Sequence, residues 1–177
     1  MKKIILTLII TTFCSAIFAQ TQIRNTFFQI SKLPASFELI SGNQLTHFDA
    51  VFDHTYAKDL VNAKFLSNGQ VLVSIEEQKD LVKPLRKSLE SYQQEVVNRL
   101  NRDKKSKLSQ SEIIKIGQIR YLIIKSKRNS DELITFTTDY TNSFGRMTGI
   151  IEFKAKDRKL AEKALKEILE NTIRIEP

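Results

Sequence analysis

Both histidines of the chain lie in one short segment that also carries two aspartates. The four side chains there that could bind a metal ion are His47, Asp49, Asp53 and His54. Imidazole nitrogens and carboxylate oxygens are common ligands for zinc and other divalent ions. This set is therefore the candidate metal site of the sequence, and a metal-dependent hydrolase is the activity it would support.

The spacing of the two histidines decides which local structure such a site needs. On a helix, His47 and His54 would lie about 10 Å apart along the axis, and on a strand they would point to opposite faces. Only a loop brings both to one ion. The competing interpretation is a solvated polar segment in which Phe48 and Phe52 pack on a sheet.

Other catalytic patterns are weak. The acidic pairs and triplets are Glu76, Glu77 and Asp80, and Asp131 and Glu132. Each lies at a predicted strand end or turn, where acidic residues are common. The sequence has no Gly-x-Ser-x-Gly elbow, no phosphate-binding loop and only 5 glycines in all. We therefore predict no catalytic residue and no cofactor.

The N-terminus has the three parts of a secretory signal peptide. Lys2 and Lys3 precede an apolar run over residues 4–13, and Ala16 and Ala19 supply small residues before polar Gln20. The run is shorter than the roughly 20 apolar residues of a membrane-spanning helix. We predict cleavage after Ala19, so that residues 1–19 are the signal peptide. The mature protein is then soluble in the periplasm or outside the cell, with no transmembrane segment.

The single cysteine, Cys14, falls inside this leader. Thr11, Thr12 and bulky Phe13 precede it, which is not the small-residue pattern of a lipid-attachment site, so we do not expect a lipoprotein. Cleavage removes the only thiol. The mature chain would then depend on a packed core rather than on disulfides.

Lysine and arginine outnumber acidic residues, and the formal net charge is +8. Three basic clusters stand out: Lys104, Lys105 and Lys107; Lys115, Arg120, Lys125, Lys127 and Arg128; and Lys154, Lys156, Arg158 and Lys159. Such clusters can contact nucleic-acid phosphates, but predicted export excludes nucleic acid. Weak attraction to an anionic surface and a merely solvated face are the two remaining interpretations.

In the first half of the chain, the sequence pattern predicts short strands. Residues 20–33 show no clear period and are interpreted as a lead-in segment, and residues 36–40 form a short strand. Asn68 and Gly69 between the β-rich runs 63–66 and 71–75 predict a hairpin, because both residues tolerate positive φ. Residues 45–62 could be helix, strand or loop.

The second half predicts helix, four strands and helix. An apolar stripe at helical spacing predicts a long amphipathic helix over 82–102, and Pro84 places its regular start near Lys83. A polar, basic exit loop over 101–107 follows the helix. Four β-rich runs then form a meander: 113–116, 119–127, 133–140 and 147–153. A closing helix is capped by Asp157, and Ile173 and Ile175 form a short extended tail.

Within the third run the residues alternate, and Ile134, Phe136, Thr138 and Tyr140 are the predicted core face. Strands segregated from helices indicate an α+β fold, with a long helix and a C-terminal helix packed on an antiparallel sheet in an α/β/α-sandwich-like arrangement. No linker divides the chain, so residues 20–177 are predicted to form one domain.

Several features together resemble the PsbP-like superfamily. They are Leu33-Pro34-Ala35-Ser36-Phe37 opening the first strand, a lone Gly117 between two β runs after the long helix, the strand Thr135-Phe136-Thr137-Thr138, and the closing helix end over 166–173. The superfamily has an antiparallel sheet between helices and includes photosystem II accessory proteins and many small exported bacterial proteins. The resemblance implies a non-enzymatic accessory role with a protein partner, and it carries over no functional residue.

The sequence therefore predicts an exported accessory or binding protein of the cell envelope, without catalytic activity. It would act through contacts with a protein partner or an anionic surface. Two alternatives stay open. One is an envelope metal-dependent hydrolase that uses the segment from His47 to His54. The other is a carrier of a small apolar ligand, with a cavity of roughly 300 Å³ or more on the concave face of the sheet.

Overall fold

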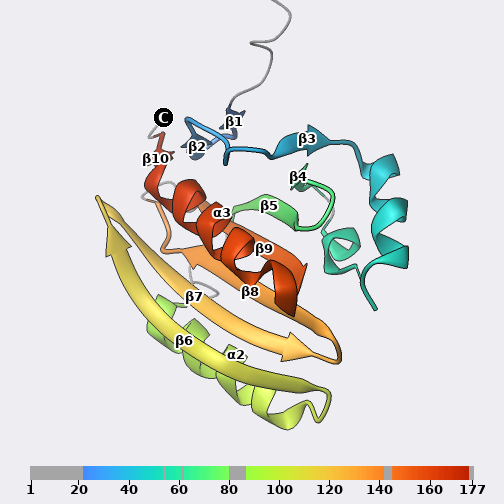
Figure 1. Ribbon diagram of the computed structural model, residues 1–177. Coiled ribbons are helices and arrows are strands. Elements are labelled where there is room, and N and C mark those ends of the chain that lie inside the picture. The colour runs from blue at the N-terminus through green and yellow to red at the C-terminus, as the bar shows by residue number, and fades with distance from the viewer. Residues whose placement is uncertain (1–21, 54, 61, 80–86, 142–144, 176–177) are drawn as a thin grey trace, which may run out of the picture.

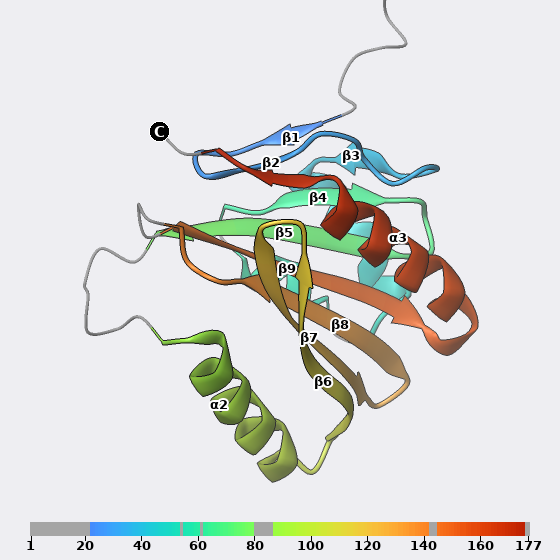
Figure 2. The same ribbon diagram turned by 90° about the vertical axis from the view of Figure 1, so that its left-hand side faces the viewer.

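The structure is a computed structural model, and it describes residues 22–53, 55–60, 62–79, 87–141 and 145–175. Its centre is a seven-stranded antiparallel sheet. Helix α3 (Arg158–Glu170) lies on one face of this sheet and helix α2 (Leu89–Arg102) on the other (Figures 1 and 2). The architecture confirms the predicted α+β fold.

Strand order in the large sheet follows two meanders joined at its centre. The strands, from edge to edge, are β3 (Glu38–Ile40), β4 (Lys64–Ser67), β5 (Leu72–Lys79), β9 (Gly145–Lys154), β8 (Asp131–Thr138), β7 (Ile119–Arg128) and β6 (Ser106–Ile116). The four C-terminal strands β6 to β9 are the predicted meander. Strand β6 begins at Ser106, so the predicted exit loop over 101–107 is too long: its last residues already pair with β7.

A second, three-stranded sheet consists of β1 (Ile23–Arg24), β2 (Phe28–Ile30) and β10 (Thr172–Arg174), in the order β1-β2-β10. The interpretation of residues 20–33 as a lead-in segment was wrong, because this stretch provides two of the three strands. The predicted extended tail is confirmed as β10, which pairs with β2. This long-range pairing, absent from any local pattern, brings the two ends of the described chain together.

The main hydrophobic core lies between the large sheet and the layer formed by α3 and the small sheet. Strand β8 contributes Ile134 and Phe136, strand β9 contributes Ile151, and α3 contributes Ile168, and all four are fully buried. Thr138 is buried as well, so the predicted inward face of β8 is confirmed for Ile134, Phe136 and Thr138, whereas Tyr140 lies beyond the end of the strand and is half-buried. Burial of these large apolar side chains is the dominant favourable term in folding.

Helix α2 packs on the opposite face, at the end of the sheet formed by β6 and β7. Its Leu89 and Val96 contact Leu122 and Ile124 of β7. In the described part of the chain the helix begins at Leu89, because residues 87 and 88 are not helical; the predicted start near Lys83 lies outside the described residues. Ser88 is its N-cap, and the Ser88 hydroxyl accepts a hydrogen bond from the Ser91 N–H at 3.1 Å. A serine cap satisfies an otherwise unpaired amide and fixes the first turn.

The predicted hairpin between β4 and β5 is confirmed. Gly69 has φ +85°, and the Asn68 side chain accepts hydrogen bonds from the N–H groups of Gln70 and Val71. The capping position of Asp157 before α3 is also confirmed, after the short 3-10 turn η4 (Ala155–Asp157).

Residues 45–62, whose structure the sequence left open, contain two 3-10 helices. They are η1 (Gly42–Ala50) and η2 (Tyr56–Asp59). Phe48 and Phe52 of this segment pack on Leu72 of β5, as predicted. The segment thus covers the face of the sheet that carries α2, but at the other end. No helix in the described part of the chain is long and apolar enough to cross a membrane.

Candidate binding groove between helix α2 and the sheet

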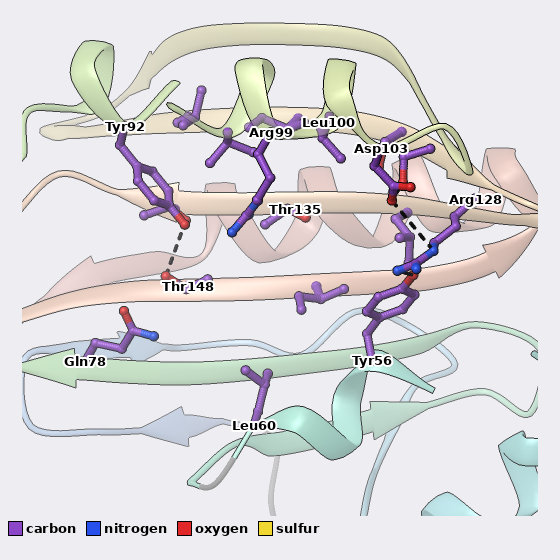
Figure 3. Close-up of a pocket in the computed structure, with 18 residues that line it drawn as sticks. Tyr56, Leu60, Gln78, Tyr92, Arg99, Leu100, Asp103, Arg128, Thr135 and Thr148 are labelled. Atoms are coloured by element: carbon purple, nitrogen blue, oxygen red, sulfur yellow. Dashed lines mark hydrogen bonds and ion pairs between the residues drawn. The ribbon is translucent and has the colours of Figure 1, made fainter. Parts of the chain in front are cut away.

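A cavity of about 430 Å³ lies on the face of the sheet that carries α2. Helix α2 forms one wall, the segment around η2 forms the opposite wall, and strands β7, β8 and β9 form the floor (Figure 3). The cavity exists because α2 and η2 cover only the two ends of this face and leave its middle uncovered. We call this feature the groove.

The floor is built by the residues of β8 and β9 that alternate with the core. Thr135 pairs in register with Ile150, and Thr137 pairs with Thr148. The hydroxyls of Thr137 and Thr148 lie 3.3 Å apart and share a hydrogen bond. Successive residues of a strand point to opposite faces, so the burial of Ile134 and Phe136 in the core fixes these threonines in the groove.

The walls are largely apolar. On the side of α2, Val96 and Leu100 face Leu122 and Ile124 of β7, and Leu60 lies on the opposite side. Tyr92 extends from the first turns of α2 toward Thr148 (Figure 3). The groove therefore combines apolar walls with a hydroxyl-rich floor, which is the usual composition of a site for a small organic molecule.

One end of the groove is closed by an arginine with two partners. The Arg128 guanidinium donates to the Tyr56 hydroxyl at 2.7 Å, and Arg128 Nε lies 4.0 Å from an Asp103 carboxylate oxygen. The hydrogen bond to Tyr56 is the main reason that the pKa of Arg128 is raised. The pKa of Asp103 is lowered, chiefly because its carboxylate accepts the Lys105 N–H. Both groups are charged at neutral pH, and their charges offset each other.

A second arginine, Arg99 of α2, points into the groove between Tyr92 and Asp103 (Figure 3). It is solvent-exposed, and its guanidinium forms no ion pair or hydrogen bond with any residue that the structure describes. Its charge does act on Glu95, whose pKa is lowered mainly by the hydrogen bond with Lys87 and to a smaller extent by Arg99. Arg99 is thus the unpaired charge among the lining residues.

Beyond Tyr92, a third arginine marks the other end of the groove. The Arg146 guanidinium lies 5.0 Å from the centre of the Tyr92 ring and 5.2 Å from that of Tyr140. It also donates to the Gln78 side-chain oxygen at 3.0 and 3.2 Å. Two cation–π contacts and two hydrogen bonds hold this side chain in place.

The predicted metal ligands do not lie in this groove. Asp49 accepts a hydrogen bond from the Thr55 hydroxyl at 3.1 Å and forms an ion pair with Lys58. His47 is exposed and contacts Phe48 edge-on. The Asp53 carboxylate accepts from the Ser130 hydroxyl at 3.3 Å. Among the described residues no three His, Cys, Asp or Glu side chains are grouped to hold a metal ion. His54 lies outside the described residues, so the metal site stays a prediction.

The acidic clusters that we weighed for acid–base chemistry have structural partners. Glu77 accepts hydrogen bonds from three consecutive backbone N–H groups, those of Thr26, Phe27 and Phe28, at 2.7 to 3.1 Å. Asp131 accepts from the Asp53 N–H at 2.7 Å. Glu132 forms two hydrogen bonds with Arg158, which are the main cause of its lowered pKa. Asp80 lies outside the described residues.

The sequence predicted no site from the groove residues, although Arg128 belongs to one of the basic clusters and Thr135 and Thr137 to a predicted strand. The one available signal was the alternation in β8, which assigned Thr135 and Thr137 to the face away from the core. That face looked merely solvated, because nothing local indicates that α2 and η2 stand on either side of it. The residues next to Arg99 in the sequence also gave no sign of a binding role, since lysine and arginine are frequent throughout the chain.

The solved structures that are similar to this chain include the following two. The crystal structure of LpqN, involved in cell envelope biogenesis of Mycobacterium tuberculosis, matches with a TM-score of 0.54 and 8% identity, over 81% of each chain. The solution structure of cyanobacterial PsbP (CyanoP) from Synechocystis sp. PCC 6803 matches with a TM-score of 0.51 and 8% identity, over 87% of this chain and 91% of that one. The likeness shows the fold alone, and it confirms the PsbP-like fold. No sequence-family model and no curated protein matches the sequence.

Proposed function

We propose that this chain is an exported accessory protein of the cell envelope that binds a small, partly apolar molecule in the groove. The observation that carries the proposal is the cavity of about 430 Å³ between α2, η2 and the floor of β8 and β9. Sites for small organic molecules span roughly 300 to 1,000 Å³ and combine apolar walls with a few polar groups. The groove has this size and composition.

The chemistry of the lining favours binding over catalysis. The charged residues that line the groove are Arg99, Asp103 and Arg128, and its remaining polar groups are hydroxyls and one amide. No histidine or cysteine occurs among these described lining residues. A hydroxyl without a neighbouring base is a poor nucleophile, so the hydroxyls of the floor are suited to hydrogen-bonding a ligand.

The envelope location rests on the signal-peptide pattern of residues 1–19. It is in keeping with LpqN, a protein of the same fold that is described as involved in cell envelope biogenesis. Cleavage after Ala19 would release residues 20–177 as the mature domain. N-terminal sequencing of protein recovered from the periplasm or the medium is expected to begin at Gln20. A sequence that begins at Met1 would contradict cleavage of the signal peptide, and recovery of the protein from the cytoplasm alone would contradict export.

A filled groove tests the binding function. Thr135 lies in the centre of the floor, and Thr135→Phe places an aromatic ring there without disturbing the core face of β8. The matched control is Thr46→Phe, at an exposed position of η1. The probe is N-phenyl-1-naphthylamine, an uncharged dye whose fluorescence rises in apolar sites.

We expect saturable dye binding to the wild type and to Thr46→Phe, and a reduction of roughly tenfold or more in affinity for Thr135→Phe. Thermal unfolding of each variant verifies that it is folded. Absence of saturable binding to the wild type, or equal binding by both variants, would show that the groove does not take up small apolar molecules.

A further inference from the structure

We infer that the groove selects ligands with an anionic group, a carboxylate or a phosphate, attached to an apolar body, and that Arg99 is the residue that recognises the anion. This inference rests on the proposed binding function. It adds the chemical class of the ligand and names the side chain that decides between charged and uncharged molecules.

The charges along the groove support an anion. Of the three charged lining residues, Asp103 and Arg128 offset each other, with 4.0 Å between carboxylate oxygen and guanidinium nitrogen. Arg99 remains, with no ion pair among the described residues. The lining therefore has a net charge of one positive unit. A planar guanidinium presents two parallel donors that match the oxygens of a carboxylate or phosphate.

The position of Arg99 links this charge to the apolar wall. Residues three and four apart on a helix lie on one face, and Arg99 follows Val96 by three residues and directly precedes Leu100. Val96 and Leu100 contact the apolar side of β7, while the Arg99 side chain extends over the floor toward Thr135 (Figure 3). One molecule can therefore place its apolar part between α2 and β7 and its anionic end at Arg99.

Other cations near the groove are less suited to this role. Arg128 already has Tyr56 and Asp103 as partners. Arg146 is held between two tyrosine rings and by Gln78, and it does not line the cavity. Arg99 is the side chain that can turn to a ligand without breaking an ion pair or a side-chain hydrogen bond within the described part of the chain. It gives up only an electrostatic attraction to exposed Glu95, whose carboxylate is already paired with Lys87.

Three probes of equal chain length separate charge from apolar affinity: decanoate, decyl phosphate and 1-decanol. Isothermal titration calorimetry of the mature protein gives the affinity for each. A hydrogen bond between two charged groups is stronger than one between neutral groups, so we expect at least one of the two anions to bind about tenfold or more tightly than 1-decanol. The anion that binds more tightly identifies a free fatty acid or a phosphate headgroup as the source of the charge.

The variant Arg99→Gln removes the charge and keeps a polar, though shorter, side chain. We expect it to bind 1-decanol as the wild type does and to lose the preference for the anion. The control is Arg102→Gln, which makes the same change in net charge at an exposed position of the same helix outside the groove. It is expected to keep the preference.

The outcomes are distinct. Equal affinity of the wild type for 1-decanol and both anions overturns the inference and leaves the binding function intact. Loss of the anion preference in both variants also overturns it, because general electrostatic attraction would then be the cause. If none of the three probes binds, the proposed function itself fails.

Discussion

The two faces of the large sheet are built from the same strands, yet one is a packed core and the other contains a groove. In β9, Ile151 is fully buried against the layer of α3, whereas its neighbour Ile150 is half-buried in the groove. In β8, buried Ile134 and Phe136 alternate with Thr135, which is half-buried, and with Thr137, which is buried beneath the groove. Thr135 and Ile150, in the uncovered middle of the groove face, therefore gain only part of the free energy of burial, whereas their neighbours on the core face gain all of it.

This difference separates two roles of the sheet: one face provides the main hydrophobic core, and the other face contains the cavity. The α3 face is covered along its length by α3 and the small sheet, so it provides the large contiguous core. The opposite face is covered at its two ends only, by separate apolar clusters around α2 and η1. Shorter, hydroxyl-bearing side chains in its middle tolerate water, so the uncovered part can be reserved for a ligand.

The neighbouring isoleucines of β9 test the comparison most strongly. Ile151→Ala would leave a cavity in the main core and destabilise the protein by about 3 to 4 kcal/mol. Ile150→Ala removes the same atoms from the partly exposed floor and should cost about 1 kcal/mol. Urea unfolding of both variants measures the two free energies. Equal losses would mean that the groove face is as tightly packed as the core.

A glycine next to this pair tests how tightly the core face is packed. A Cβ atom on Gly149 would lie 2.1 Å from the Phe136 ring. Gly149→Ala must displace that buried ring, and we expect a loss of about 3 kcal/mol in the free energy of unfolding. Gly42→Ala is the control, because nothing lies within 4 Å of its added Cβ. A tolerated Gly149→Ala would show that Phe136 can move freely.

Two adjacent glutamates of β5 allow the same comparison for hydrogen bonds, because one has several partners and the other has one. Glu77 ties the turn between β1 and β2 to the large sheet through three backbone N–H groups, whereas Glu76 accepts one hydrogen bond from Gln78. Glu77→Gln should cost about 2 kcal/mol, because it weakens three charge-assisted hydrogen bonds. Glu76→Gln should cost less than about 0.5 kcal/mol. Hydrogen exchange of the Phe27 and Phe28 amides should quicken only in the first variant.

The smallest expected effect on the free energy of unfolding comes from ionisation of Tyr121, and it occurs only at alkaline pH. Burial on the core face raises the pKa of Tyr121 to about 12, from a usual value of 10.0. The stability gained by keeping the phenol neutral is complete below pH 10 and is lost as the pH rises from 10 toward about 12. Tyr121→Phe removes this dependence, so its unfolding midpoint in urea should fall less between pH 9 and pH 11 than that of the wild type. Identical slopes would contradict burial of the hydroxyl.

Local patterns predicted those parts of the fold that depend on neighbouring residues. Asn68 and Gly69 specified a hairpin, because their conformational freedom is a property of the residues themselves. The alternation in β8 assigned Ile134 and Phe136 to the core, and Asp157 marked the start of α3. The spacing did not predict the helix boundary at Ser88, which caps α2, because the apolar stripe continues through this position at helical spacing.

Features that depend on residues far apart could not be predicted in this way. The pairing of β2 with β10 joins residues on opposite ends of the chain, and neither strand has a pattern of its own. The 3-10 structure of residues 42–50 is set by packing of Phe48 and Phe52 on Leu72 as much as by local preference. The groove likewise depends on contacts between distant segments, because its lining residues come from nearly every part of the chain between Tyr56 and Ile150.

The sequence by itself determined the order of most elements, the PsbP-like fold class and the side chains of β8 that face the core. These follow from periodicity and turn preference, which are local properties of the chain. Tertiary structure alone decided that threonines on the other face form the floor of a cavity and that Arg99 lies above it unpaired. The physical reason is that a cavity and an unpaired charge depend on the distances between segments that are far apart in the sequence. A pattern of neighbouring residues carries no information about these distances.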